Sequence, residues 1–278
     1  NVLDGNVSID PISGDWPLLH QNPQNTRCAE GKGPDSNDFN WFSIIGEEDE
    51  VILSPVIRDG VLYTSYLTST KLYYIPDIRV PGDEEWKTPN YEKDFDNDKW
   101  LVNSPVITED SIIISTGKTD NEGTSNYVIA LDKPILSPRW VFLYDEDICY
   151  SSSPVVYDDK VFVTSWSGDP DAFQSNTNNK VIALDLSHGS QLWEYNLPAG
   201  SFSTPAVYKG VIFVGCNKKR GDSLFALDIE SGSKIWSKSV SAIRSASPVI
   251  YNDTVFIMSE SCCKIKLTAL SIDNGSVL

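Results

Sequence analysis

The sequence predicts an all-β fold built from five repeated units of four short strands each. Three observations support this fold class. A Ser/Thr-Pro step recurs at intervals of 43 to 51 residues, a tight pair such as Asp59-Gly60 follows each step, and an Ala-Leu-Asp motif stands ten residues before a Trp. The steps are Ser54-Pro55-Val56, Ser104-Pro105-Val106, Ser153-Pro154-Val155, Thr204-Pro205-Ala206 and Ser247-Pro248-Val249. Four-stranded units repeated at this interval are typical of a β-propeller, in which each blade buries its faces against its neighbours.

The order of these signals predicts the strands of each unit. The inner strand begins after the Ser/Thr-Pro step, where a Pro without an N–H costs no ladder bond, and the tight pair returns the chain as its hairpin partner. A third strand ends at the Ala-Leu-Asp motif, and the outer strand carries the Trp. The first unit is degenerate, with Ile75-Pro76-Asp77 and Trp86. The expected blades are residues 44–86, 87–140, 141–193, 194–236 and 237–278, after an extended segment at 1–40.

The two ends of the repeat region complement each other. The last unit reaches Leu278 one residue before its expected Trp, and Asn40-Trp41-Phe42-Ser43 resembles an outer strand with no unit before it. Unpaired sheet edges promote aggregation, so we expect the strand at 40–43 to complete the last blade. This strand would close a five-bladed propeller over residues 41–278.

The repeated tryptophans are predicted to pack between blades, because large aromatic side chains bring the most buried area. They are therefore interpreted as core residues and not as an aromatic binding site. The set comprises Trp41, Trp86, Trp140, Trp193 and Trp236.

The charge balance disfavours two classes of partner. The 278-residue chain has 22 Lys and Arg against 39 Asp and Glu, and its net charge of −17 repels phosphate backbones and anionic lipid surfaces. No apolar run approaches the roughly 20 residues that a spanning helix requires. We expect neither a nucleic-acid partner nor a membrane span.

The Ala-x-Asp-x-x-x-Gly-x-x-x-Trp signature, complete from Ala183 to Trp193 and from Ala226 to Trp236, resembles the quinoprotein repeat when taken with the Ser-Pro-Val step. That repeat is named after pyrroloquinoline quinone (PQQ), and the resemblance covers residues 41–278. The segment from Trp16 to Thr26 is similar to the opening of secreted members of the family. The resemblance implies a propeller fold. It implies either a PQQ-dependent dehydrogenase or a cofactor-free member that acts as an assembly scaffold or surface protein.

Two features bear on the dehydrogenase alternative. Enzymatic members have about eight blades, a bound calcium and, in several, a disulfide between adjacent cysteines, and Cys262-Cys263 is an adjacent pair. By register, however, this pair falls between the second and third strands of its blade and not at the start of an inner strand. The weak calcium candidate is formed by Asp94, Asp96 and Asp98, but Lys99 replaces the turn Gly and Pro105 stands at the twelfth position. We expect a solvated acidic loop there, with no metal site.

The remaining cysteines and the sequons give predictions about modification. Cys216 and Cys262 both follow the second strand of their blades, so a disulfide from Cys216 to Cys262 or Cys263 is predicted, with a vicinal Cys262–Cys263 bond and burial as a free thiol left open. Glycosylation candidates are Asn6, Asn252 and Asn274.

The sequence favours a non-catalytic, secreted or cell-surface propeller that acts as a structural or protein-interaction module. The only histidines, His20 and His188, have no evident nucleophile partner, so no catalytic residue is assigned. We expect no cofactor, a protein partner or self-assembly, and an extracellular, cell-surface or periplasmic location. The alternatives are a PQQ-dependent dehydrogenase with calcium, or a fragment of one, and a carbohydrate-binding propeller.

Overall fold

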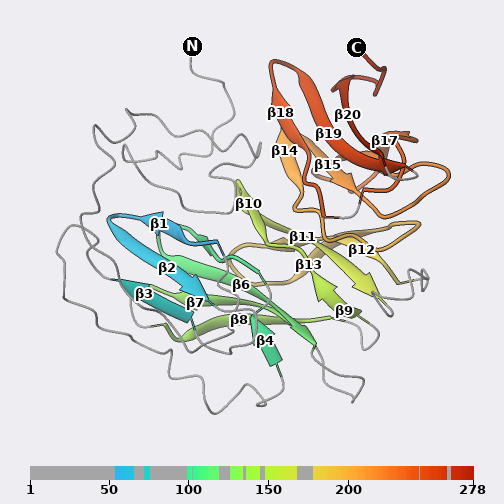
Figure 1. Ribbon diagram of the computed structural model, residues 1–278. Helices are drawn as coiled ribbons and strands as arrows, with labels where there is room; N and C mark the ends of the chain where they lie inside the picture. Colours follow the sequence, from blue (N-terminus) through green and yellow to red (C-terminus); the bar gives the residue numbers. More distant parts are fainter. Residues whose placement is uncertain are drawn as a thin grey trace, which may run out of the picture.

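The computed structural model describes five antiparallel sheets that follow one another in chain order (Figure 1). It describes residues 54–65, 72–75, 99–101, 103–118, 126–133, 136–144, 148–167, 178–243, 245–261 and 264–278. Within these ranges every regular element is a β-strand. The all-β fold class and the repeated blades are therefore confirmed. The extended segment at 1–40, the closing strand at 40–43, Trp41 and Trp86 lie outside the described residues.

The first two blades hold the N-terminal strands of the described chain. The first blade has the order β1 (Val56–Arg58), β2 (Val61–Ser65) and β3 (Leu72–Ile75). The second blade has the order β5 (Val106–Ile107), β6 (Ser111–Lys118), β7 (Tyr127–Asp132) and β8 (Pro138–Leu143), and β4 (Lys99–Leu101) also pairs with β6.

The other three blades repeat this order. The third blade contains β10 (Val155–Tyr157), β11 (Lys160–Ser167), β12 (Lys180–Asp185) and β13 (Gln191–Asn196), with β9 (Ile148–Ser151) paired to β11. The fourth blade contains β14 (Ala206–Tyr208), β15 (Val211–Gly215), β16 (Leu224–Asp228) and β17 (Lys234–Lys238). The fifth blade contains β18 (Val249–Tyr251), β19 (Thr254–Ser261) and β20 (Lys264–Ser271).

Two features of the strands go beyond the repeat pattern. The additional strands β4 and β9 pair with the far ends of β6 and β11, so the second and third blades each have a fifth strand. The outer strands also continue past their tryptophans, to Leu143, Asn196 and Lys238. Neither feature carries a repeated sequence signal.

The pairing register is the same from blade to blade. The inner hairpins pair Val155 with Phe162 and Ala206 with Phe213, and their tight pairs adopt positive φ, as at Gly210 (φ 74°). In the second, third and fourth blades the Ala of the motif lies opposite the Trp ten residues later. The predicted hairpins and the placement of the Trp on the fourth strand are thereby confirmed for these blades.

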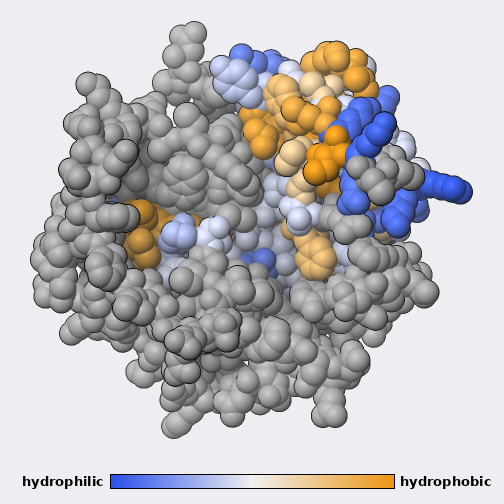
Figure 2. All heavy atoms as spheres, viewed as in Figure 1, coloured by the Kyte–Doolittle hydropathy of each residue, from blue (hydrophilic) through white to orange (hydrophobic). Residues whose placement is uncertain are grey.

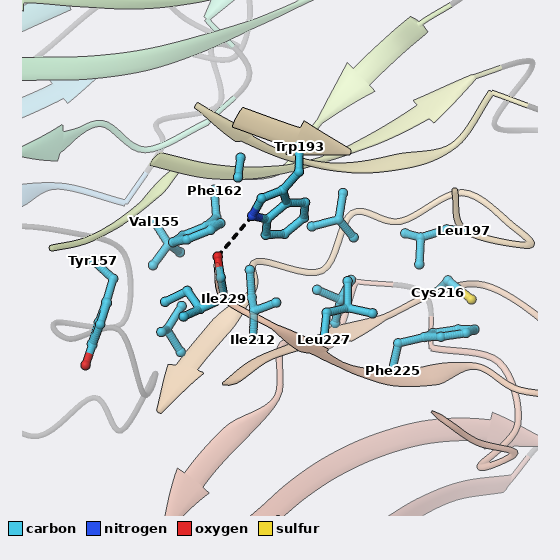
Figure 3. Close-up of a cluster of buried hydrophobic side chains, with 14 of the residues drawn as sticks. Val155, Tyr157, Phe162, Trp193, Leu197, Ile212, Cys216, Phe225, Leu227 and Ile229 are labelled. Carbon is cyan, nitrogen blue, oxygen red and sulfur yellow. Dashed lines mark hydrogen bonds between the residues drawn. The ribbon is translucent and has the colours of Figure 1, made fainter. Parts of the chain in front are cut away.

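The hydrophobic core consists of separate layers between consecutive blades. One layer joins the third and fourth blades, with Val155, Phe162 and Trp193 on one side and Ile212 and Leu227 on the other (Figure 3). Three further layers join the first blade to the second, the second to the third and the fourth to the fifth. Each of the first four sheets is thus stabilised by the apolar face of the sheet that follows it.

A tryptophan and a glycine make the same contact in three of these layers. The indole N–H of Trp193 donates to the carbonyl of Ile229 in the next blade at 3.0 Å, and its ring lies on Gly232 (Figure 3). A Cβ at Gly232 would stand 2.5 Å from Cε3 of Trp193, and the backbone there has φ 68°. In the same way, the indole N–H of Trp140 donates to the Leu186 carbonyl at 2.8 Å, and that of Trp236 donates to the Ile272 carbonyl at 2.7 Å. In the structure Trp140, Trp193 and Trp236 therefore pack between blades.

The Asp of the motif shapes the turn that carries this glycine. Oδ1 of Asp228 accepts hydrogen bonds from the Ser231 hydroxyl at 2.7 Å and from the backbone N–H groups of Ser231 and Glu230. The same bonds, the Ser231 hydroxyl first, hold the pKa of the Asp228 carboxyl below its usual value. The turn is therefore preorganised by the carboxylate, and it presents Gly232 to the preceding blade.

The contact between tryptophan and glycine predicts the cost of adding one methyl group. Gly232→Ala should destabilise the protein both through its positive φ, which costs a non-glycine residue about 1–2 kcal/mol, and through overpacking against Trp193, which costs about 1–3 kcal/mol more. Gly210→Ala is the matched control, because Gly210 also has positive φ (74°) but its nearest neighbour to a Cβ is 3.9 Å away. Urea unfolding should show a larger loss in the free energy of unfolding for Gly232→Ala than for Gly210→Ala. Equal losses would contradict this packing.

Candidate functional site

The structure describes one of the three cysteines that were considered for disulfides. Cys216 is a free thiol, buried in the layer between the third and fourth blades. Burial raises the pKa of the Cys216 thiol to about 12. With Cys216 as a free thiol, the expected cross-blade disulfide is not formed in this structure. Cys262 and Cys263 lie outside the described residues, so the vicinal disulfide stays a prediction.

The state of Cys216 gives a chemical prediction. A buried thiol with a raised pKa has little thiolate at pH 8, so Cys216 should resist iodoacetamide in the native protein and react once the chain is unfolded without reductant. Peptide mapping by mass spectrometry measures both states. A Cys216 that reacts only after reduction would show that it is disulfide-bonded, and rapid alkylation of the native protein would contradict its burial.

The candidate calcium ligands Asp94, Asp96 and Asp98 lie outside the described residues. Within the part of the chain that the structure describes, no group of three His, Cys, Asp or Glu side chains is arranged to hold a metal ion.

His188, the one described histidine, occupies a turn and not a cleft. Its side chain is exposed, and ring Nδ1 lies 3.0 Å from Oδ1 of Asp185, the carboxylate that also accepts the backbone N–H groups of Ser187 and His188. This is the same turn that presents a glycine to the preceding tryptophan. Its exposed side chain makes His188 a surface residue.

The two described glycosylation candidates stand beside each other at the turns of the fifth blade. Asn252 and Asn274 are both exposed, and the two turns are joined by a hydrogen bond from Ile272 N–H to the Asp253 carbonyl at 3.2 Å. Both sequons are open to modification on one face. Glycosylation itself stays a prediction, and Asn6 lies outside the described residues.

A buried network of hydroxyl groups was missed by the sequence analysis. The Ser115 hydroxyl on β6 donates to the Ser152 carbonyl of the next blade at 3.0 Å, and the Thr164 hydroxyl on β11 donates to the Ser203 carbonyl of its next blade at 3.1 Å. The two donors hold the same repeat position, two residues after the large apolar residue of the second strand. That spacing is readable in the sequence. These bonds satisfy the carbonyls that lead into the inner strands and join neighbouring blades there.

The outer strands of three consecutive blades carry exposed apolar side chains, two of which hold the same repeat position. Leu192 on β13 and Ile235 on β17 directly precede the tryptophans of their blades, and each side chain is about half exposed, at 45% and 48%. On β8 the apolar side chains of Val141 and Leu143 are similarly exposed. We call these four residues the outer row. Because apolar residues recur at the rims of three consecutive blades, the outer row is a candidate contact surface.

Hydrophobic side chains also gather over the fourth and fifth blades, next to strongly hydrophilic ones (Figure 2). The exposed large apolar residues on strands β18, β19 and β20 of the fifth blade are Tyr251, Met258, Ile265 and Leu267. The described part of the chain contains no helix with the length and apolar character needed to cross a bilayer.

Comparison with known proteins gives one family match and several similar folds. A family model described as outer membrane protein assembly factor BamB matches residues 150–278. No curated protein sequence matches the chain.

Three solved structures illustrate the fold similarity. BamB from Moraxella catarrhalis is 16% identical with a TM-score of 0.55, over 81% of this chain and 62% of its own. A europium-containing methanol dehydrogenase is 13% identical with a TM-score of 0.68, over 96% and 58%. The quinohemoprotein alcohol dehydrogenase from Comamonas testosteroni is 16% identical with a TM-score of 0.69, over 95% and 48%.

These identities support a shared fold alone, and the chain spans less than two thirds of the length of each of these structures. The family match over residues 150–278, the recurring Trp and Gly contact and the blade order agree with one another. The chain carries a PQQ-type repeat, the family match covers residues 150–278, and the fold is that of a β-propeller.

Proposed function

We propose that this chain is a non-catalytic, exported propeller that binds another protein through the rims of its blades. The observation that carries the proposal is the outer row, because four apolar side chains on the outermost strands are exposed although the interfaces between the blades are closely packed. Burying exposed apolar area is the main favourable contribution to protein association.

The family match supports the same class of function. The matching model is described as an outer membrane protein assembly factor, which is a protein that acts on other proteins in the cell envelope. An envelope or cell-surface location also suits the two exposed sequons of the fifth blade. The proposal extends this role to a chain that shares only the repeat and the fold with BamB.

Site-specific cross-linking tests the proposal. A photoreactive amino acid placed at Leu192 or at Ile235 should cross-link the same partner protein in envelope extracts of the native source, whereas the exposed turn residue Ser231 should not when it carries the same probe. Leu192→Gln should remove the cross-link formed at Ile235. This substitution should leave thermal stability nearly unchanged, since exposed surface changes are usually worth within about 0.5 kcal/mol.

Three results would overturn the proposal. A cross-link at Ser231 as strong as those at Leu192 and Ile235 would show that contact with the outer row is not specific. Stoichiometric PQQ binding in the presence of calcium, together with dye reduction by an alcohol, would instead establish the dehydrogenase alternative. A glycan-array signal that survives Leu192→Gln, with no cross-linked protein, would favour the carbohydrate-binding alternative.

A further inference from the structure

The loop between β15 and β16 carries positive charge in a chain whose net charge is −17. Lys218, Lys219 and Arg220 stand consecutively in this loop, and the side chain of Arg220 is exposed. Asp222 is the one carboxylate of the loop, and it accepts a hydrogen bond from the Ser237 hydroxyl. The loop therefore has a net positive charge at neutral pH.

Lys238 adds a further cation where this loop ends. It pairs with Leu224, the first residue of β16, and its carbonyl accepts a hydrogen bond from the Ser223 N–H at 3.0 Å. Its side chain is half-buried, so the ammonium group starts from the same end of the fourth blade as the loop.

Backbone hydrogen bonds connect the loop to the fifth blade. The Cys216 carbonyl, at the start of the loop, accepts from the Ile243 N–H at 3.1 Å. The neighbouring Ala242 carbonyl accepts from the Glu260 N–H at 2.9 Å, and Glu260 pairs with Ile265 on β20. The loop and the beginning of β20 therefore lie at the same end of two adjacent blades.

The beginning of β20 alternates between cations and apolar side chains. Lys264, Ile265, Lys266 and Leu267 are all exposed, Ile265 at 80% and Leu267 at 66%. Successive side chains of a strand point to opposite faces, so the lysines and the apolar residues lie on opposite faces of β20. Strongly hydrophilic and hydrophobic side chains are indeed neighbours over these two blades (Figure 2).

Five basic side chains make up this surface, which we call the basic face: Lys218, Arg220, Lys238, Lys264 and Lys266. Among the described residues, none of the five forms an ion pair. At the other end of the blades, by contrast, Lys160 lies 3.2 Å from Glu230 and Lys209 lies 2.8 Å from Asp253. The basic face thus has cations that the described carboxylates leave without a partner.

We propose that the basic face binds a short acidic segment of a partner protein. This inference rests on the proposed function, protein binding, and it adds a second contact of stated chemistry. A bilayer or a nucleic acid is an extended anion and would also meet the carboxylates that give the chain its net charge of −17. A short segment contacts the basic face alone, because exposed charges farther apart than about 8 Å are screened at physiological ionic strength.

One extended segment reaches both blades. Packed sheets lie about 10 Å apart, and an extended chain of about ten residues spans about 33 Å. Its carboxylates pair with the cations of the loop and of β20, and an apolar side chain among them contacts Ile265. Charge complementarity of this kind determines which partner binds and how fast it associates.

Fluorescence anisotropy on the full 278-residue chain tests the proposal with a labelled oligoglutamate peptide of about ten residues. The peptide should bind, and its affinity should fall severalfold when NaCl is raised from about 50 to about 200 mM, because salt screens exposed charges. Lys218→Gln with Arg220→Gln should weaken binding about fivefold or more, and so should Lys264→Gln with Lys266→Gln.

Lys209→Gln with Lys234→Gln is the matched control, because it removes the same charge from exposed positions at the other end of the fourth blade. This variant should weaken peptide binding less than about twofold. A loss equal to that of Lys218→Gln with Arg220→Gln would show that net charge alone governs binding and would overturn the proposal.

The choice of partner has its own tests. The proposal is wrong if the peptide does not bind at low salt, or if phosphatidylglycerol vesicles or a single-stranded oligodeoxynucleotide bind the basic face as tightly as the peptide does. Leu192→Gln should leave peptide binding unchanged, since the outer row lies elsewhere on the blades. Peptide binding without cross-links at Leu192 and Ile235 would therefore contradict the proposed role of the outer row and leave the basic face supported.

Discussion

The blade arrangement depends on one contact, in which a tryptophan ring of one blade packs on a glycine turn of the next. Each such ring packs in the interface between two blades, and its N–H donates to a backbone carbonyl of the next blade. Two constraints select glycine at this position. The backbone has positive φ, and any side chain would collide with the tryptophan ring. The angle between neighbouring sheets is thus fixed by a side chain of one blade and a backbone turn of the next.

This contact explains why much of the fold could be predicted from the sequence. The motif places Ala, Asp, Gly and Trp at fixed intervals. It encodes a strand, a turn closed by the Asp carboxylate and a Trp that packs on the next blade, all within about eleven consecutive residues. The hairpins were equally readable, because positive φ at pairs such as Asp59-Gly60 restricts the residue types. Leu136 shows the limit of the pattern, since it adopts φ 56° at the position where the other blades have Gly.

The features that the sequence did not reveal depend on contacts between segments far apart. The strands β4 and β9 have no repeated signal, and their pairing depends on how far β6 and β11 extend beyond the inner strands. The hydroxyl bonds of Ser115 and Thr164 were missed because isolated Ser and Thr residues are common and their partners are backbone carbonyls of another blade. The outer row could be recognised only once the outer strands were placed, because Leu192 and Ile235 look like core residues beside a tryptophan.

Function follows from where the apolar surface is left uncovered. The layers between blades contain the large apolar residues of the repeat. The exposed apolar side chains are those of the outer row and those on strands β18, β19 and β20 of the fifth blade. These two surfaces differ in their surroundings. Strand β20 also carries the exposed Lys264 and Lys266, whereas the outer row lies on strands that already complete their blades.

A double-mutant cycle between Trp193 and Gly232 tests the central claim most directly, because it measures whether ring and turn act as one unit. The free energy of unfolding lost in Gly232→Ala should be at least about 1 kcal/mol smaller when Trp193→Leu is already present, since no ring then meets the added methyl group. The same cycle between Trp140 and Gly232, which belong to different interfaces, should be additive within about 0.5 kcal/mol. Additive costs for Trp193 and Gly232 would contradict the claim that this contact joins the blades.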